Sequence, residues 1–424
     1  MVAADVAVVG GGPAGAAAAI TLARGGRDVV LVDRARFPRD KCCGDGLTTG
    51  ALRRLEELGL RPSTVASWKP VDDVWVRSPS GRTTAFPFPA GQGTFAAVAR
   101  RVDLDAALLN VARAAGVKVF DGHGLRGARW EPGADVVELD VDGIGTVAAR
   151  YAVGADGMWS PLRKALGPAD EAGYLGEWHA FRQYFRGVSE AAASQLWVWF
   201  EPDLLPGYAW SFPLGSGRAN VGFGIQRAAG APTRSMGEQW RELLERPHLR
   251  AVLGEGAEPE APHKAWPIPA RLERTSVAGA GGRVLFAGDA ARGTDPMTGE
   301  GIGQALEMGM LAGRSILAAG ARDPGGAAAI YERAVRSGLG VDNRLAGLLS
   351  RHGIAHRKGV RSALWLAGTS AWTRRNFARW LFEDYPRALV FTPHRWRRGT
   401  LSQSGAFSSG TPLPAHLTAQ RRPG

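Results

Sequence analysis

The sequence contains little cysteine and no recognisable cluster of metal ligands. Its 424 residues include 2 cysteines, the adjacent pair Cys42 and Cys43. Such a pair is not a disulfide framework and lacks the ligand number of a zinc site. The low cysteine content suits a reducing compartment, in which a strained vicinal disulfide is not favoured. The 8 histidines are scattered without metal-ligand spacing, and there is no nucleophile elbow, so we predict neither a metal site nor a hydrolase.

The sequence also lacks a long apolar run. The best candidate for a membrane span, residues 302–319, carries Glu307 and Arg314, whereas a spanning helix needs about 18 uninterrupted apolar residues. The N-terminus passes almost directly into an apolar strand at Val6–Val9 without a basic region before it, which argues against a signal peptide. We therefore expect a folded cytoplasmic protein.

Charge is unevenly distributed along the chain. The net charge is +12, and the segment from Asn343 to the C-terminus, with 14 Lys and Arg against 2 acidic residues, accounts for all of it. A basic segment of this kind can face nucleic acid or anionic lipid, or can be a solvated tail. We predict no nucleic-acid partner and keep the anionic membrane surface and the solvated tail as alternatives.

The N-terminal segment has the pattern of a nucleotide-binding βαβ unit. A strand over 5–9, a glycine turn over 10–15, a helix over 16–24 and a strand over 28–32 follow one another, so we expect a parallel sheet. The turn has G-x-G-x-x-G spacing, which lets the backbone approach a pyrophosphate at the helix N-terminus, and Asp33 can accept the hydroxyls of a ribose. The predicted nucleotide contacts are Gly10, Gly12, Pro13, Ala14, Gly15, Asp33 and Arg34.

Three further patterns follow in order along the chain. They are R-x-x-L-D-x-x-L from Arg101, Gly-Ala-Asp-Gly at 154–157, and Gly-Asp at 288–289 followed by Asp-Pro-Met-Thr-Gly-Glu-Gly-Ile at 295–302. Together with the glycine turn they resemble the flavoprotein family of aromatic hydroxylases and geranylgeranyl reductases. The resemblance implies FAD as the cofactor, with an arginine beside its phosphates, the Gly-Asp pair on its ribityl chain and the later helix start near its flavin ring. The implied cofactor contacts are Cys43, Gly44, Arg101, Asp156, Gly288, Asp289, Gly299, Gly301 and Ile302.

Two other segments are similar to the geranylgeranyl reductase branch. Residues 41–47 resemble K-x-C-G-x-G-L, and residues 206–213 contain Y-x-W-x-F-P. The resemblance implies that Tyr208, Trp210 and Phe212 line a tunnel for a long apolar substrate, and core packing by these aromatics is the alternative.

Cys43 is the candidate catalytic residue. A thiol in this loop would lie beside the flavin and deliver a proton or control access, whereas an inert buried thiol is the alternative. Cys42 stands where members of the resembled branch often have proline, so this loop departs from the pattern of the family.

These patterns predict an α/β fold with a Rossmann-type FAD-binding domain interleaved with a β-sheet substrate domain, plus a helical C-terminus. We expect helices over 49–58 and 102–115, β-rich stretches over 71–88, 118–153 and 177–226, and a helix from about Glu300. The predicted limits are 1–70, 98–170 and 277–325 for the FAD-binding domain, 71–97 and 171–276 for the substrate domain, 326–398 for the helical segment and 399–424 for a disordered tail.

The predicted function is reduction of an isoprenoid carbon–carbon double bond by hydride transfer from flavin N5, on a geranylgeranyl lipid or the prenyl tail of a quinone. The first alternative is an FAD-dependent monooxygenase or halogenase, although Tyr208 and Phe212 differ from the halogenase pattern W-x-W-x-I-P. The second is a non-catalytic flavin-bearing lipid-binding protein. Because a second G-x-G-x-x-G unit is missing, NADPH, NADH or ferredoxin would meet the flavin transiently, and the sequence does not choose among these donors.

The C-terminal helices combine aromatic and basic residues. An interface with an anionic membrane at the inner membrane face would use this mixture, and inward packing of the aromatics with solvated arginines is the alternative. The residues concerned are Trp365, Trp372, Phe377, Trp380 and Leu381, with Arg361, Arg374, Arg375, Arg379 and Arg387.

Overall fold

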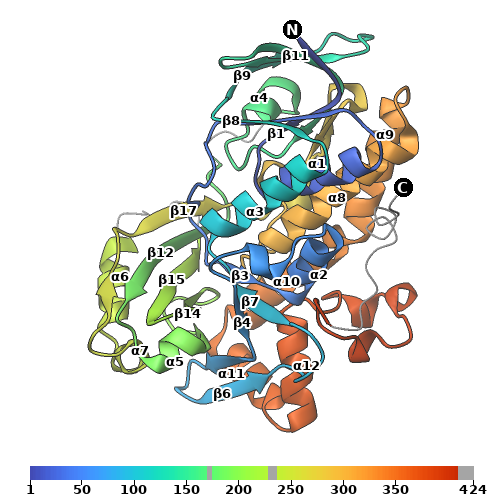
Figure 1. Cartoon of the computed structure of the whole chain (residues 1–424). Coiled ribbons are helices and arrows are strands. Elements are labelled where there is room, and N and C mark those ends of the chain that lie inside the picture. Colours follow the sequence, from blue (N-terminus) through green and yellow to red (C-terminus); the bar gives the residue numbers. More distant parts are fainter. Residues whose placement is uncertain (170–173, 228–235, 409–424) are drawn as a thin grey trace, which may run out of the picture.

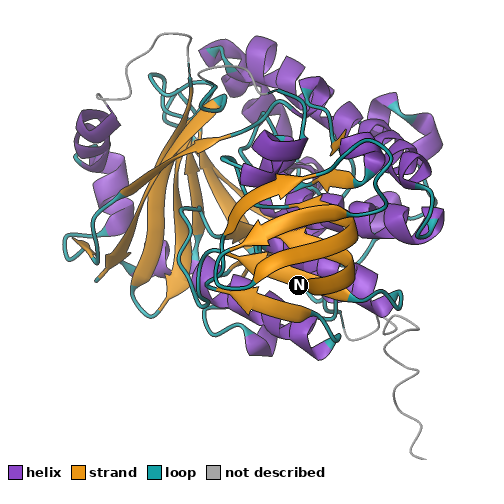
Figure 2. Ribbon diagram, turned by 90° about the horizontal axis from the view of Figure 1, so that it is seen from above, coloured by secondary structure: helices purple, strands orange, loops and turns teal. Residues whose placement is uncertain are grey.

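The computed structural model describes residues 1–169, 174–227 and 236–408. Two large sheets lie next to one another, and helices cover their outer faces (Figure 1, Figure 2). The N-terminus belongs to the first sheet, and the last helices lie at the opposite end of the molecule, beside the second sheet (Figure 1).

The first sheet is the predicted nucleotide-binding sheet. Strands β1, β2, β8, β11 and β19 pair in parallel, with β1 between β11 and β2. The remaining pairs, β18 with β19 and the β9–β10–β11 extension, are antiparallel, so the expectation of a parallel sheet holds for its centre. The strands are β1 (Val2–Val9), β2 (Val29–Asp33), β8 (Lys118–Asp121), β9 (Leu125–Arg129), β10 (Val137–Val141), β11 (Gly145–Gly154), β18 (Ala278–Gly279) and β19 (Val284–Phe286).

Two glycines fix the turn between β1 and helix α1 (Pro13–Arg24). Gly10 has φ +106°, and a Cβ atom there would lie 2.2 Å from the carbonyl oxygen of Ala155. A Cβ atom on Gly15 would lie 1.8 Å from the carbonyl oxygen of Gly10. Both positions therefore require glycine, because any side chain would collide with backbone. The helix begins three positions earlier than predicted, with Pro13 at its first turn, where proline is well tolerated.

The second sheet forms the wall of the substrate side. Its order is β16-β12-β15-β14-β13-β5-β6, and β17 also pairs with β12. Side chains alternate across it, so Trp197, Trp199 and Phe223 pack on one face against α5, α6 and α7. The strands are β5 (Asp73–Arg77), β6 (Thr83–Pro87), β12 (Trp178–Arg186), β13 (Leu196–Trp199), β14 (Tyr208–Gly215), β15 (Arg218–Gln226), β16 (Glu258–Pro259) and β17 (Lys264–Ile268).

A small sheet and the helices join these two layers. Strands β3 (Gly46–Leu47), β7 (Ala96–Val98) and β4 (Lys69–Val71) pair antiparallel. Thr48 caps α2, because its hydroxyl accepts a hydrogen bond from Ala51 N at 3.3 Å. The helices other than α1 are α2 (Thr49–Glu57), α3 (Arg101–Ala114), α4 (Pro161–Leu166), α5 (Glu190–Ser194), α6 (Met236–Leu244), α7 (Pro247–Leu253), α8 (Ile302–Ala319), α9 (Pro324–Ser337), α10 (Leu339–Leu349), α11 (Arg357–Ala367) and α12 (Ala371–Leu381).

The C-terminal segment departs from the predictions in two respects. Arg379 and Arg387 are buried in ion pairs with Asp384 and Asp295, so their assignment to a membrane interface is wrong. Their guanidinium groups form ion pairs with buried carboxylates inside the protein instead.

The expectation of disorder from residue 399 is also wrong for residues 399–408. Ala406 is buried and pairs with Thr94 in an isolated β-bridge. Its amide donates to Thr94 O at 2.9 Å. A stretch rich in serine and glycine is held here by backbone hydrogen bonds to a loop far away in sequence, and residues 409–424 lie outside the described residues.

The predicted fold class is confirmed: a Rossmann-type unit interleaves with a β-sheet unit and is followed by helices. We propose the domain limits 1–70, 98–170 and 277–325, and 71–97 and 171–276, on the support of this division into two sheets. Among the described residues, none of the helices combines the length and the hydropathy of a membrane span.

Candidate active site

A large cavity lies where the two sheets and the C-terminal helices meet. Its volume is about 1320 Å³. One end is lined by the glycine turn and the ends of β2 and β11, and the other by β13, β14 and helices α11 and α12. The cavity therefore connects a nucleotide-like end to an aromatic end.

The nucleotide end presents backbone donors. Gly12 caps α1 without a side-chain hydrogen bond, and the first turn of this helix carries no acidic residue. Asp33 is held in place because its Oδ2 accepts from Gly11 N at 2.6 Å and its Oδ1 from Ala35 N at 2.8 Å. A helix N-terminus with free amides next to a fixed carboxylate suits a phosphate joined to a ribose.

Two arginines, the buried Arg101 and the half-buried Arg39, flank the same turn. A Cβ atom on Gly12 would lie 3.5 Å from Arg39 Nη2 and 3.9 Å from Arg101 Nη2. Asp105, fully buried, pairs with both: Arg101 Nη2 lies 2.7 Å and Arg39 Nη1 3.1 Å from its Oδ2. Burial opposes the charge on Arg101, but Asp105 outweighs it and raises the pKa of this guanidinium. Two guanidinium groups with one carboxylate leave a net positive charge, which suits a diphosphate.

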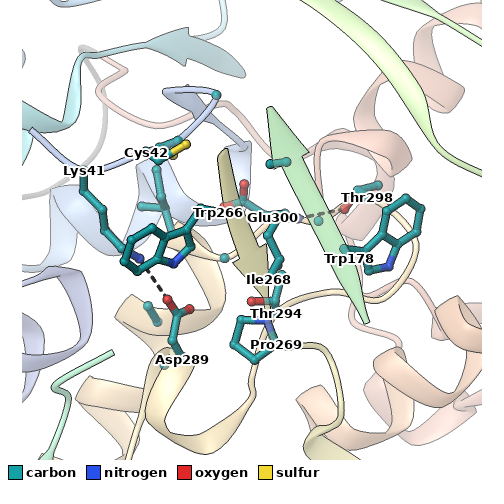
Figure 3. A pocket seen from close by; sticks show the side chains of 18 of the residues that line it. Lys41, Cys42, Trp178, Trp266, Ile268, Pro269, Asp289, Thr294, Thr298 and Glu300 are labelled. Carbon is teal, nitrogen blue, oxygen red and sulfur yellow. Dashed lines mark hydrogen bonds and ion pairs between the residues drawn. The ribbon is translucent and has the colours of Figure 1, made fainter. Parts of the chain in front are cut away.

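Lys41 and Asp289 face each other across the middle of the cavity (Figure 3). Lys41 Nζ donates to Asp289 Oδ2 at 2.8 Å. Burial acts to raise the pKa of Asp289, but Lys41 reverses this and brings it below its usual value. Asp289 is therefore an ionised acceptor at neutral pH.

The aromatic end is built from side chains on one face of the second sheet. Tyr208, Trp210 and Phe212 occupy alternate positions of β14, and all three line the cavity. Trp210 Nε1 donates to Asn220 Oδ1 at 3.2 Å, and the Tyr208 hydroxyl donates to Thr298 O. Phe377, Trp380 and Leu381 of α12 line the cavity as well. The polar atoms are thus paired within the wall, which leaves an apolar surface for a ligand.

Asp45 is the centre of a buried network between the two ends. Its Oδ2 accepts from the Tyr184 hydroxyl at 2.7 Å and from Asn220 Nδ2 at 2.8 Å, and its Oδ1 accepts from Arg101 N at 3.2 Å. Burial raises the pKa of Asp45 to about 6, against the opposing effect of these hydrogen bonds. Asp45 thereby ties the loop before β3 to the second sheet.

The neighbouring thiols are free. The Cys43 Sγ accepts from Asp45 N at 3.4 Å, and burial raises the pKa of Cys43 above its usual value. Burial likewise raises the pKa of Cys42 to about 11. Neither environment stabilises a thiolate, so both thiols keep their protons. The catalytic assignment of Cys43 stays a prediction.

Comparisons with known proteins agree with this geometry. Residues 3–325 match the family described as FAD binding domain. The menaquinone reductase of Mycolicibacterium smegmatis is 35% identical over 82% of this chain and 85% of that protein. Digeranylgeranylglycerophospholipid reductase 1 of Methanopyrus kandleri is 33% identical over 73% of this chain and 79% of that protein.

The chain belongs to the geranylgeranyl reductase family of FAD-dependent oxidoreductases. A geranylgeranyl bacteriochlorophyll reductase-like protein of Thermoplasma acidophilum shares the fold, with a TM-score of 0.74 and 20% identity over 93% of this chain and 100% of that one. FAD as the cofactor is thereby confirmed, and the prediction of an isoprenoid reductase is confirmed at the level of the family.

The residues present fit FAD. The turn at Gly12 leaves room and free amides between two arginines for a diphosphate, Asp33 suits the adenosine ribose, and Asp289 suits hydroxyls of the ribityl chain. When bound, FAD would supply a hydride. The chain itself provides binding, orientation and a dry enclosure.

The structure brings the predicted site residues together with one exception. Gly15 does not line the cavity and instead packs α1 against the strand–turn backbone. Both Asp156 oxygens are occupied, by the Ser160 hydroxyl and Leu162 N at the start of α4. The others line the cavity and stay predictions as contacts; they are Gly10, Gly12, Pro13, Ala14, Asp33, Arg34, Cys43, Gly44, Arg101, Asp156, Tyr208, Trp210, Phe212, Gly288, Asp289, Gly299, Gly301 and Ile302.

Sequence reasoning missed Arg39, Lys41, Asp45 and Glu300 as chemically active members of this wall. Lys41, Asp45 and Glu300 lie inside the recognised motifs. Their charged side chains within those motifs were the signal that could have identified them. Arg39 carries no such signal, because its approach to Gly12 depends on the path of the loop after β2.

Proposed function

We propose that the enzyme reduces a carbon–carbon double bond in the prenyl tail of a quinone. Relatives that are 35% identical are named menaquinone reductase, and a prenyl tail matches the apolar wall of the cavity. The single observation that carries the proposal is the continuity of one cavity from the nucleotide end at Gly12 to the aromatic strand at Trp210.

The chain's contribution is alignment and exclusion of water. An isolated alkene is a weak electrophile, so it must be held close to the hydride donor in a fixed orientation. Tyr208, Trp210 and Phe212 of β14 and Phe377 and Trp380 of α12 line the same end of the cavity and give it an aromatic wall. The hydride comes from the reduced cofactor, and the wall directs the double bond toward it.

A digeranylgeranyl lipid is the second candidate substrate, because a relative of that name is 33% identical. The test is an anaerobic incubation of dithionite-reduced holoenzyme with a menaquinone and with digeranylgeranylglycerophospholipid, followed by mass spectrometry. We expect the quinone tail to gain two hydrogens. A gain on the lipid alone would move the substrate to that class.

Other outcomes of the same experiment would overturn the reductase proposal. Product formation that requires oxygen would indicate a monooxygenase or halogenase. A prenyl ligand that binds to the reduced holoenzyme and is recovered unchanged would indicate a lipid-binding protein.

We also propose that α11 and α12 dock the protein on an anionic membrane, at the inner face of the cell membrane. The exposed fractions of Trp365, Leu366 and Trp372 are 61%, 62% and 60%. Arg361 and Arg375 on the same two helices are exposed as well. Interfacial aromatics next to basic residues favour peripheral binding to anionic lipid.

The inner side of the same helices supports this proposal. Val360 and Leu364 of α11 and Phe377, Trp380 and Leu381 of α12 line the cavity. The two helices thus separate the apolar end of the cavity from the surface that carries the exposed tryptophans. A prenyl chain taken from a bilayer at this surface would have a short path into the cavity.

A further inference from the structure

Glu300 occupies the point at which the two ends of the cavity meet. Two residues before it, the carbonyl of Thr298 accepts the hydrogen bond from Tyr208 of the aromatic strand. Two residues after it, Ile302 begins α8, whose Ala305 lies against Gly288 of the nucleotide end. Glu300 itself lines the cavity, and Figure 3 shows it among the drawn lining residues. A cofactor at one end and a prenyl chain at the other would therefore meet beside this carboxyl group.

The surroundings of Glu300 are rich in carboxylates. Its Oε1 accepts from Gly303 N at 2.8 Å, which anchors the side chain at the start of α8. The charged and titratable groups facing it are Asp295 from the preceding loop, Glu383 and Arg387 from the segment after α12, Tyr208 from β14, and Cys43 from the loop before β3.

Arg387 is the cation of this group, and it is already paired with carboxylates other than Glu300. Arg387 Nε lies 2.7 Å from Asp295 Oδ2, and its Nη2 lies 3.1 Å from Glu383 Oε1. One guanidinium thus faces three carboxyl groups, counting Glu300. Burial, followed by repulsion from Glu383, raises the pKa of Glu300 to about 8. Burial and the neighbouring carboxylates thus favour the protonated form of Glu300 on the wall of the cavity.

We propose that Glu300 is the catalytic acid that protonates the substrate carbon next to the one that receives the hydride. The step rests on the proposed reduction of a prenyl double bond. One C–H bond forms with the hydride and its electron pair, which the reduced flavin supplies as it is oxidised. The other C–H bond forms as the π electrons take the proton from Glu300, whose O–H bond breaks. Glu300 ends as a carboxylate and regains a proton from solvent before the next turnover.

Two other buried acids are poorer candidates. The Asp45 carboxylate accepts three hydrogen bonds, from Tyr184, Asn220 and the Arg101 amide. These bonds hold its negative form and occupy its oxygens. The Cys43 thiol holds its proton tightly because burial raises its pKa. Glu300 lines the cavity, and among the described residues its carboxyl group takes part in one hydrogen bond, from Gly303 N to Oε1, so the other oxygen is left for a ligand.

The test compares wild type with Glu300→Gln, which keeps an acceptor for Gly303 N and removes the acidic proton. Each holoenzyme is reduced with dithionite under anaerobic conditions and mixed with a menaquinone. Samples quenched at successive times are reoxidised in air and analysed by mass spectrometry for two hydrogens added to the prenyl tail, because the quinone ring can itself reoxidise the flavin. We expect equal FAD content and a rate lower by about 10²–10⁴-fold in the variant, the usual contribution of a general acid. Glu332→Gln on α9 is the matched control, because Glu332 lies outside the cavity wall and pairs with Arg336.

A second readout does not depend on turnover. Infrared difference spectra of the holoenzyme between pH 6 and pH 10 should show the carbonyl band of a protonated carboxylic acid that disappears near pH 8, and Glu300→Gln should lack this band. Because the protonated form is the donor, the single-turnover rate of wild type should fall as pH rises through the same value. Glu383→Gln removes the repulsion, so both transitions should move to lower pH.

The outcomes separate the two proposals. If wild type reduces no prenyl substrate, the proposed function fails and the role of Glu300 fails with it. If wild type reduces the prenyl tail and Glu300→Gln does so at the same rate, only the role of Glu300 is overturned. The same holds if the band persists in the variant.

Discussion

The two ends of the cavity differ in what gives them their shape, which is backbone at one end and side chains at the other. At the nucleotide end, the shape is made by backbone: Gly10 and Gly15 bring strand, turn and helix into contact, and fixed charges at Asp33 and Arg101 complete the site. At the aromatic end, the shape is made by side chains from β14 and α12, whose sequence positions are far apart. The first kind of site tolerates almost no substitution at its glycines. The second tolerates exchanges of similar volume and is therefore free to change its ligand.

The largest effect is expected from a side chain at Gly15. A Cβ atom there would lie 1.8 Å from the carbonyl oxygen of Gly10. Because this oxygen belongs to the backbone, a change of side-chain rotamer cannot relieve the clash. Gly15→Val should abolish FAD retention. It should also lower the free energy of unfolding by at least about 1–3 kcal/mol, the usual cost of overpacking a core. Flavin absorbance after purification and thermal unfolding provide the measurement.

The control for this prediction is Gly127→Ala on β9, where a Cβ atom would meet nothing within 4 Å. It should keep FAD and wild-type stability within about 0.5–1 kcal/mol, since it adds a methyl group in open space. A yellow, stable Gly15→Val protein would show that the turn is not fixed in the way described.

The next effect concerns Arg387, the buried cation paired with Asp295 and Glu383. Arg387→Met leaves Asp295 and Glu383 without their buried partner, and loss of one member of a buried ion pair costs about 3–5 kcal/mol. Arg387 lowers the pKa of Glu383 in the native protein, so its removal raises that pKa further above the unfolded value. The loss should therefore be small near pH 5, where the unfolded carboxyl groups begin to be protonated, and should increase toward pH 8.

Urea unfolding at several pH values measures this dependence. Arg336→Met serves as the control, because its pair with Glu332 is half exposed and contributes at most about 1 kcal/mol. Equal destabilisation by both variants, or a loss that shrinks with rising pH, would contradict the account of this cluster.

The sequence was sufficient for the nucleotide end because each of its constraints is local. The glycine spacing, the strand before it and Asp33 after the second strand lie within one βαβ unit, and their geometry follows from short-range sterics. The same sequence does not reveal that Glu300 faces Glu383, or that Asp105 pairs with Arg39. Such contacts depend on how remote segments pack.

The errors at the C-terminus have the same origin. Composition alone made residues 399–408 look unstructured, and it placed Arg379 and Arg387 among the residues of a membrane surface. The bridge between Ala406 and Thr94 and the internal ion pairs of Arg379 and Arg387 are tertiary facts. A helix pattern distinguishes buried from exposed apolar positions better than it identifies a buried arginine, because burial of arginine depends on where its carboxylate partner lies.

A smaller effect should distinguish the aromatic end from ordinary core. Trp210 lines the cavity, whereas Trp197 on the neighbouring strand packs on the opposite face of the same sheet. Trp210→Leu should lower kcat/KM for a long prenyl substrate by about tenfold or more, since orientation of the chain is lost, with FAD content unchanged. Trp197→Leu should lower the free energy of unfolding by about as much as Trp210→Leu does. It should leave kcat/KM near the wild-type value.

This pair of variants tests the assignment of the wall directly. Steady-state kinetics with prenyl chains of two lengths and thermal unfolding are both measured on each protein. Matching losses of kcat/KM in the two variants would mean that Trp210 acts through packing rather than through contact with substrate.

The smallest expected effect is at the outer surface of the aromatic end. Arg361 and Arg375 are exposed on α11 and α12 beside Trp365 and Trp372, and each basic residue near an anionic membrane contributes about 1 kcal/mol before screening. The double change Arg361→Glu and Arg375→Glu should therefore weaken co-sedimentation with vesicles of anionic lipid by more than tenfold at low salt. FAD content and turnover of detergent-dispersed substrate should be unchanged, because neither residue lines the cavity.

The matched control is the pair Arg336→Glu and Arg250→Glu. These two arginines carry the same charge but lie on α9 and α7 rather than on α11 and α12. If the control pair reduces vesicle binding as strongly, net charge alone governs the attraction and α11 and α12 are not the docking surface; if wild type ignores anionic vesicles at low salt, the protein does not dock there at all.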